Sequence, residues 1–364
     1  MGFNAAVVEK KLDWSSSAIK FCDDFLQSSL PKYILGCNIY AKSVAEHIDI
    51  DGFIDDYSSN LKFLGKPVVK SSLVPQNSLV LNVAGGRPLS ARTRLNALGL
   101  QNLDYFAFSK IAPLPLRELR FNEGFEREFL ENNNKYQWIY NLLKDEESRD
   151  VFARLVKFRF DHDISHLEGF TQREDIQYFE NFLCLNEDHE LFLDVGGYDG
   201  YTTQEFIKLC PQFDSIHIFE PDKKNYDSCL AALSQYKNVN FHLLGLSNQK
   251  QTLRFNMMGS SSSVSQDGSV IINVDRLDDI LKVRPTFIKI DIEGAELAAI
   301  EGGRNTILNG HPKMAISIYH NPGDFWRIPE LILSIRDDYD VYIRHYTESI
   351  YETVMFFLPR KVST

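Results

Sequence analysis

Two acidic residues flank a glycine-rich turn in the middle of the chain. Residues 191–200 read Leu-Phe-Leu-Asp-Val-Gly-Gly-Tyr-Asp-Gly, an apolar strand that runs into a turn, with Asp194 before the glycines and Asp199 among them. Glycine lets backbone N–H groups approach a ligand and tolerates the positive φ of such turns. A dinucleotide site uses a Gly-x-Gly-x-x-Gly turn and a helix N-terminus to bind a pyrophosphate. Two carboxylates would repel that group, so we expect a ligand that carries positive charge.

A third acid ends a second predicted strand. Residues 215–219 alternate as a strand does, and Glu220 follows them, twenty residues beyond Gly200. An acid at this place of a βαβ unit accepts hydrogen bonds from both hydroxyls of an adenosine ribose. Ribose, ammonium and sulfonium occur together in S-adenosylmethionine, which we therefore predict as the cofactor. The alternative, that Asp194 and Glu220 only cap loops, is disfavoured because strand, glycine turn, helix, strand and acid follow in order.

The alternation of strands and helices continues to the C-terminus. Further strands are expected at 239–244, 286–291, 313–318, 340–343 and 354–358, with helices at 295–307 and 328–335. This order indicates a mostly parallel sheet that is covered on both faces. The loop 344–353 is too short for a helical crossover, so the last strand should be antiparallel. An α/β fold with a Rossmann-like seven-stranded sheet and a reversed last strand is the architecture of class I methyltransferases.

Four segments of this half resemble a known family. They are 192–203, 219–221, 274–281 and 287–297, and the last is the most specific because of its aliphatic-Lys-aliphatic-Asp-aliphatic-Glu-Gly-Ala-Glu string. In these segments the chain is similar to the FkbM-type methyltransferases. The resemblance begins near Tyr178 and reaches the C-terminus. It implies O-methylation of a hydroxyl with S-adenosylmethionine, often on a sugar or a polyketide-like natural product.

The turn, the strand-end acids and the resemblance together define the candidate cofactor contacts. Tyr178 enters because its position lies beside the cofactor or acceptor in similar proteins, although packing on the sheet edge would explain it equally well. The full set is Tyr178, Asp194, Gly196, Gly197, Tyr198, Asp199, Gly200, Thr202, Glu220, Pro221, Leu246 and Asp291.

Methylation of a hydroxyl also needs an acceptor for its proton, either a general base or a metal-stabilised alkoxide. Open α/β sheets bind ligands at the carboxyl ends of their strands. Asp291, His320 and His345 each end or follow one of the predicted strands. We predict His320 as the base, Asp291 as its electrostatic partner and His345 as the alternative base. A divalent metal held by Asp291, a neighbouring acid and a histidine stays open, as does a purely structural role for each residue.

The first third of the chain has its own organisation. Short strands are expected at 33–36, 52–54, 67–69, 78–82 and 104–108, with helices at 39–47 and 93–98. This pattern predicts a smaller Rossmann-like α/β domain. Its glycine signal consists of Gly36 alone, so ligand binding and a docking or dimerisation surface are both open. The next stretch has apolar pairs at helical spacing. We expect three parts, namely the small domain (1–112), a helical connector or cap (113–185) and the methyltransferase domain (186–364).

The amino-acid composition limits the kinds of molecule that this protein can be expected to bind. The net charge of −11 argues against a nucleic-acid partner, which needs clustered Lys and Arg. No apolar run approaches the roughly 20 residues that cross a bilayer, and no signal peptide is evident. The five cysteines are scattered and lack a Cys-x-x-Cys pair, as expected of reduced thiols. We therefore expect a cytoplasmic enzyme with a small, polar, sugar-like acceptor and no membrane partner, and a homodimer stays open.

Two other functions are weighed against this one. In an NAD(P)-dependent sugar oxidoreductase, the small domain would bind the nicotinamide cofactor, but its glycine pattern is incomplete. In a non-catalytic scaffold, both nucleotide-type folds would be degenerate, but Asp194, Glu220 and Asp291 are all present. Methyl transfer is the prediction that uses all of these features.

Overall fold

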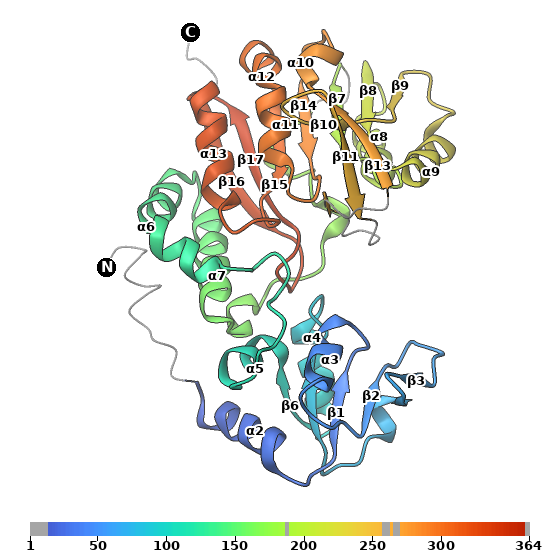
Figure 1. Ribbon diagram of the computed structural model, residues 1–364. Coiled ribbons are helices and arrows are strands. Elements are labelled where there is room, and N and C mark those ends of the chain that lie inside the picture. The colour runs from blue at the N-terminus through green and yellow to red at the C-terminus, as the bar shows by residue number, and fades with distance from the viewer. Residues whose placement is uncertain (1–13, 186–188, 257–262, 265–269, 361–364) are drawn as a thin grey trace. The chain divides into compact units, whose positions relative to one another are not determined.

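The chain forms two compact units. The computed structural model describes residues 14–185, 189–256, 263–264 and 270–360 (Figure 1). The first unit contains the described residues of Met1–Gln137 with Phe152–Gln172 and Tyr346–Tyr351. The second contains those of Trp138–Val151, Arg173–His345 and Glu352–Thr364. The three-part division at residues 112 and 185 stays a prediction.

The first unit is built on a six-stranded sheet of order β3-β4-β2-β1-β5-β6. Its neighbours are parallel except in the β3–β4 pair, which is antiparallel. A Rossmann-like α/β unit, as predicted, is therefore present. Its elements are α2 (Ser16–Gln27), β1 (Lys32–Leu35), α3 (Ile39–Ala45), β2 (Gly52–Ile54), β3 (Lys62–Phe63), β4 (Lys66–Val69), η1 (Ser71–Leu73), β5 (Leu79–Asn82), α4 (Pro88–Ala97), β6 (Gln101–Asp104) and α5 (Tyr105–Ile111).

One predicted strand is wrong. The run 104–108 was expected to be extended, but β6 ends at Asp104 and α5 begins at Tyr105. The Asp104 side chain accepts a hydrogen bond from the N–H of Ala107 at 2.9 Å, so it caps the helix. An N-cap aspartate satisfies an N–H that has no partner within the helix. This local bond outweighs the β propensity of the aromatic residues that follow.

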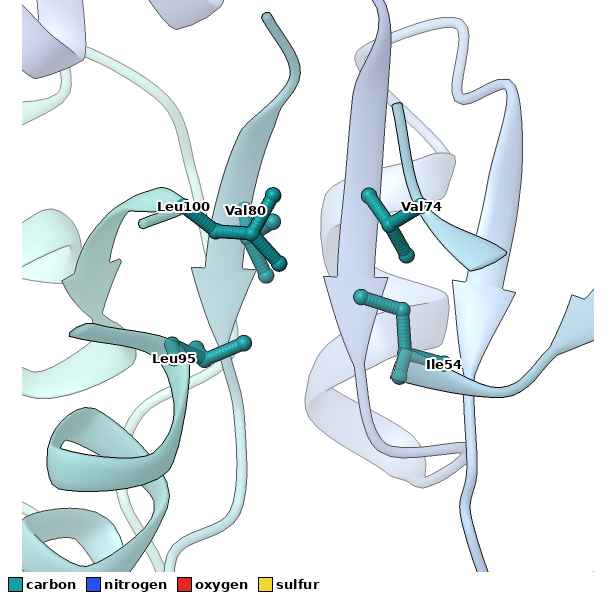
Figure 2. Packing of buried hydrophobic residues seen from close by; sticks show 5 residues of the cluster. All are labelled: Ile54, Val74, Val80, Leu95 and Leu100. Carbon is teal, nitrogen blue, oxygen red and sulfur yellow. The ribbon is translucent and has the colours of Figure 1, made fainter. Parts of the chain in front are cut away.

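A small apolar cluster holds one part of this sheet together. Ile54, Val74, Val80, Leu95 and Leu100 are all buried and pack on one another (Figure 2). Leu95 comes from α4 and is fully buried. Side chains from two strands, a helix and two loops meet here, so the cluster fixes the register of the helix on the sheet.

We expect Leu95→Ala to lower the free energy of unfolding by about 2–5 kcal/mol, because it removes buried methyl groups and leaves a cavity. The exposed Leu73 provides the matched control, since its side chain is 72% exposed. Leu73→Ala should change stability by no more than about 0.5 kcal/mol. Urea unfolding followed by circular dichroism measures both values. Equal stability of the two variants would contradict the assigned cluster.

The segment between the two sheets is helical at first and irregular later. The long helices are α6 (Phe125–Leu142) and α7 (Glu146–Asp161), and both contribute residues to each unit. Three short 3₁₀ turns follow, η2 (Ile164–Leu167), η3 (Glu174–Ile176) and η4 (Asn181–Leu183). The last two turns bring residues 174–183 to the second unit.

The second unit contains a seven-stranded sheet of order β16-β17-β15-β14-β7-β8-β9. The last strand pairs antiparallel with both neighbours, and the other pairs are parallel, so the predicted class I topology is confirmed. Its strands are β7 (Leu191–Val195), β8 (Ser215–Phe219), β9 (Val239–His242), β14 (Phe287–Ile290), β15 (Lys313–Ser317), β16 (Tyr339–His345) and β17 (Thr353–Pro359).

Helices connect these strands, and one differs from expectation. The helix predicted over 295–307 is divided at Gly303 into α11 and α12. A Cβ on Gly302 would lie 1.9 Å from the carbonyl oxygen of Ser247, so the backbones approach closely there. The helices of this unit are α8 (Tyr201–Leu209), α9 (Lys223–Leu233), α10 (Leu277–Ile280), α11 (Glu296–Gly302), α12 (Arg304–Gly310) and α13 (Asp324–Ile335).

A second, smaller sheet belongs to the same unit. It has the order β10-β13-β11-β12, with β10 (Gly245–Leu246), β11 (Gln251–Asn256), β12 (Ser263–Val264) and β13 (Val270–Asp275). Leu246, Leu253 and Val274 of this sheet line the pocket described below. Within the described part of the chain, no helix has the length and apolar character needed to span a membrane.

Candidate active site

A pocket of about 540 Å³ opens at the carboxyl ends of the central strands of the second unit. Residues that directly follow β7, β8, β14 and β15 contribute to its wall. This is the edge at which open α/β sheets bind ligands. Ten of the predicted cofactor contacts line the pocket, namely Tyr178, Gly196, Gly197, Tyr198, Asp199, Thr202, Glu220, Pro221, Leu246 and Asp291.

Two positions of the turn after β7 require glycine. Gly196 has φ +88°, and a Cβ there would lie 1.9 Å from the carbonyl oxygen of Asp291. A Cβ on Gly197 would lie 2.3 Å from Cγ2 of Ile218. The turn is therefore pressed against the ends of both neighbouring strands. Gly200, which is not among the lining residues, has φ +88° at the N-cap of α8.

A buried ion pair lies beneath this turn. The Asp194 carboxylate is 3.1 Å from Lys289 Nζ, and their side chains are 0% and 3% exposed. Asp194 also accepts a hydrogen bond from Thr203 Oγ1 at 2.7 Å. Lys289 Nζ in turn donates to the carbonyl oxygen of Gly196 at 2.6 Å. Asp194 is not among the residues that line the pocket. Its contact with the cofactor stays a prediction that this arrangement does not support, because the carboxylate is fully buried and holds Lys289.

The charge of Lys289 depends on its acidic neighbours. Burial alone would lower the pKa of this amine, but the carboxylates of Asp194 and Asp291 outweigh that effect and raise it above its ordinary value. The amine is therefore protonated. Its position 5.2 Å from the Tyr178 ring centroid adds a favourable cation–π contact. Lys289 lines the pocket, and it thus presents a fixed positive charge next to the glycine turn.

We expect Lys289→Met to lower the free energy of unfolding by about 3–5 kcal/mol, because it leaves the Asp194 carboxylate buried without its cation. Lys208 pairs with Glu205 on the surface and has a 68% exposed side chain. Lys208→Met serves as the control and should cost less than about 1 kcal/mol. Urea unfolding of both variants gives the comparison. A loss below about 1 kcal/mol in Lys289→Met would show that the pair is not a structural requirement.

Glu220 is held in a fixed orientation at the end of β8. Its carboxylate accepts the N–H of Tyr198 and the N–H of Asp222, each at 2.9 Å. Burial raises the pKa of Glu220 to about 7, although these two N–H donors act in the opposite direction. Each oxygen retains acceptor capacity for a further hydrogen bond. The geometry suits recognition of two adjacent hydroxyl groups.

A hydrogen-bonded network of polar side chains forms another part of the pocket wall. Tyr178 OH donates to Asp291 Oδ2 at 2.6 Å, and Gln177 Nε2 donates to Tyr178 OH at 2.8 Å. Gln177 also donates to Glu352. Tyr319 OH donates to Glu352 Oε1 at 3.4 Å. All five residues line the pocket, so this wall offers carboxylates and phenols to a bound molecule.

His320 does not reach the pocket. Its side chain is 1% exposed, and Nδ1 lies 3.0 Å from Glu296 Oε1. Its Nε2 is 3.5 Å from Asp291 Oδ1 and 3.8 Å from Glu293 Oε2. Burial alone would lower the pKa of His320, but the charges of Glu296, Asp291 and Glu293 raise it to about 10. These charges favour the protonated imidazole, and His320 is not among the residues that line the pocket. Its role as the base stays a prediction that this arrangement does not support.

His345 is also placed elsewhere. It is buried at the end of β16, with Nδ1 2.9 Å from Thr353 Oγ1, and it is not among the residues that line the pocket. The alternative base of the sequence prediction is therefore not brought to the site.

The acids around His320 include the residues of the predicted metal site. Asp291, Glu296 and His320 each offer a ligand atom, and these atoms lie within 4.8 Å of one another. Glu296 Oε1 is already engaged by the N–H groups of Ile292, at 2.9 Å, and Gly294, at 3.4 Å. A carboxylate and an imidazole are suitable donors for a divalent metal, and metal binding stays a prediction.

Among the lining residues that were not predicted as site residues, four make the polar contacts described above, namely Gln177, Lys289, Tyr319 and Glu352. Lys289 stands inside the most specific sequence string, and its alternation with Asp291 along a strand could have placed both on one face. Tyr319 and Gln177 are direct neighbours of predicted residues. Glu352 follows a loop, and the sequence contains no signal for the direction of its side chain.

The geometry agrees with a comparison against protein families. Residues 194–351 match the model described as the methyltransferase FkbM domain. This match confirms the resemblance to the FkbM-type methyltransferases for this part of the chain. The protein is thus a methyltransferase that depends on S-adenosylmethionine, which sets aside the oxidoreductase and the scaffold. Among curated proteins, none matches the chain.

One solved structure shows the same fold, and others align with about half of the chain. A methyltransferase FkbM from Methylobacillus flagellatus KT aligns with a TM-score of 0.77 and 22% identity over 98% of each chain. Its similarity therefore extends across both units. An rRNA methylase from Streptococcus thermophilus aligns with 50% of this chain and 93% of its own (13% identity, TM-score 0.34). A precorrin-6y C5,15-methyltransferase from Geobacter metallireducens GS-15 aligns with 53% and 94% (12% identity, TM-score 0.33).

Proposed function

We propose that this methyltransferase transfers the methyl group of S-adenosylmethionine to a hydroxyl of a small polar acceptor, such as a sugar or a natural-product precursor. The observation that carries the proposal is a single pocket with two kinds of wall. One wall contains the glycine turn and Glu220, and the other contains the network around Asp291. The first suits the cofactor and the second suits a molecule rich in hydroxyl groups.

The cofactor follows the turn in this proposal. The two hydroxyls of its ribose bind Glu220, whose carboxylate is already oriented by Tyr198 and Asp222. The methionine portion lies over Gly196, where a side chain is excluded. Pro221 and Leu246 supply an apolar contact for the adenine, and both line the pocket.

The acceptor occupies the side of Tyr178, Asp291 and Glu352. Hydroxyl groups are donors and acceptors, so they can bond both to carboxylates and to phenols. The sulfonium of the cofactor is already a good leaving group. The protein therefore has mainly to align the acceptor oxygen with the methyl carbon and to exclude water. Buried aromatic and carboxylate side chains at this wall serve both purposes.

Glu220→Ala should weaken binding of S-adenosylhomocysteine about tenfold or more, because a hydrogen bond to a charged group contributes about 1.5–3 kcal/mol. Isothermal titration calorimetry measures the dissociation constant. The control is Glu301→Ala on α11, whose side chain is 47% exposed and pairs only loosely with Arg304 at 3.6 Å. Wild-type affinity in Glu220→Ala would remove the assigned ribose contact.

The reaction itself is tested with methyl-labelled S-adenosylmethionine and a panel of acceptors. Monosaccharides, glycosides and their amino and deoxy analogues should be compared by mass spectrometry. The expected product carries the label on oxygen, with one S-adenosylhomocysteine formed per methyl group. Transfer only to nitrogen or carbon acceptors would overturn the proposal.

A divalent metal at Asp291, Glu296 and His320 is the second arrangement that the same groups allow. Such an ion would stabilise the acceptor alkoxide. EDTA then abolishes turnover, and Mg²⁺ or Mn²⁺ restores it. Turnover that is unchanged by EDTA assigns proton removal to a side chain instead.

A further inference from the structure

We propose that Glu352 is the catalytic residue that takes the proton from the acceptor hydroxyl. This inference rests on the proposed O-methylation and names the base within the same pocket. It replaces His320, which lies behind the wall, with a carboxylate that is part of it.

The position of Glu352 is determined by three separate elements. The residue directly precedes β17, and its carboxylate accepts hydrogen bonds from Gln177, which follows η3, and from Tyr319, which follows β15. It lines the pocket together with Asp291 and Tyr178. Its exposure is intermediate, as expected of a group that faces a cavity. The carboxylate is therefore fixed in place while it remains accessible to a bound molecule.

The backbone at Glu352 is strained in a way that directs this side chain. Its φ is +62°, in the left-handed region that residues with a Cβ rarely adopt. Such conformations are strained and cluster at functional sites. Glu293, which also lines the pocket, has φ +58°. Two glutamates of one wall are thus held in conformations that local sequence preference does not favour.

The surroundings give Glu352 the proton affinity that a base needs. Burial raises the pKa of Glu352 to about 7, and the negative charges of Asp291 and Glu174 act in the same direction. The hydrogen bond from Gln177 and the positive charge of His320 lower it. A carboxylate with the ordinary glutamate pKa of about 4.3 would be a much weaker base. Since the best general base has a pKa near the working pH, Glu352 is matched to neutral conditions.

The other ionisable groups at this wall have different tasks. Asp291 accepts the short bond from Tyr178 and faces the charged imidazole of His320. The pKa values of Tyr178 and Tyr319 lie well above the ordinary tyrosine value because both phenols are buried, so they remain donors. Tyr178 and Gln177 connect Asp291 to Glu352. Asp291 is therefore a positioning residue in this scheme.

The step balances without another reactant. The acceptor oxygen forms a bond to the methyl carbon, the carbon–sulfur bond breaks, and its electron pair stays on sulfur as S-adenosylhomocysteine forms. The hydroxyl proton passes to a carboxylate oxygen of Glu352. It leaves to solvent before the next turnover, which restores the base.

The test is Glu352→Gln in the full chain. Glutamine keeps the size of the side chain and one of its two acceptor oxygens but cannot take the proton. We expect kcat to fall about 10²–10⁴-fold, while the dissociation constant of S-adenosylhomocysteine changes by less than about threefold. In the wild type, kcat/KM should rise as the pH increases through about 7, where Glu352 loses its proton. Glu352→Gln should lose this rise.

Two further variants distinguish a catalytic role of Glu352 from a structural one. Glu352→Asp retains a carboxylate and should recover part of the lost activity with a displaced pH profile, which a purely structural role would not produce. Glu301→Gln on the surface of α11 is the matched control and should behave as wild type. Binding of S-adenosylhomocysteine shows that each variant is folded.

The outcomes of these experiments distinguish failure of the role of Glu352 from failure of the proposed O-methylation. Full turnover in Glu352→Gln with an unchanged pH profile overturns the role of Glu352 and leaves O-methylation intact. A wild-type enzyme that methylates no hydroxyl overturns the proposed function, and the inference fails with it. Loss of activity in Glu352→Gln that Glu352→Asp recovers supports both.

Discussion

The buried pair of Asp194 and Lys289 is the interaction on which the pocket depends. The two residues are register partners on the adjacent central strands β7 and β14, and their charged atoms are 3.1 Å apart. Burial of both charges is costly, so the pair is weak evidence for added stability. Its effect is positional, because Lys289 also bonds the carbonyl oxygen of Gly196. The glycine turn is thereby fixed to the end of β14, where a side chain on Gly196 would meet the backbone of Asp291.

The arrangement of the acceptor wall follows from the same strand. Side chains two residues apart on a strand share a face, so Asp291 emerges next to Lys289. Asp291 then accepts the Tyr178 hydroxyl and faces His320, whose charge partly offsets the acids around it. Gln177 continues the chain of contacts from Tyr178 to Glu352. A substitution at Lys289 should therefore disturb groups on both sides of the pocket, although the lysine is almost completely buried.

The sequence predicted the parts of this molecule that local pattern determines. Alternation, glycine spacing and a strand-end acid predicted the sheet, its reversed last strand and the place of Glu220. Partners far apart in sequence were beyond such reasoning. Nothing near Asp194 indicates that its cation stands at residue 289, and nothing near His320 indicates that Glu296 lies 3.0 Å from its imidazole. The protonation state of a side chain depends on which charged groups the fold brings next to it. The sequence of one strand does not show which groups these are.

In the first unit, the N-terminus of α4 is in contact with a segment that is distant in sequence. The Glu348 carboxylate accepts the N–H of Ser90, in the first turn of α4, at 3.0 Å, and Ser349 bonds the carbonyl oxygen of Gly85. Both belong to Tyr346–Tyr351, which is part of the same unit. A helix N-terminus in a Rossmann-like fold is where a phosphate would bind, because its N–H groups and dipole attract an anion. At α4 a carboxylate of the chain itself has that position. The first turn of α4 is thus stabilised by another segment of the same unit.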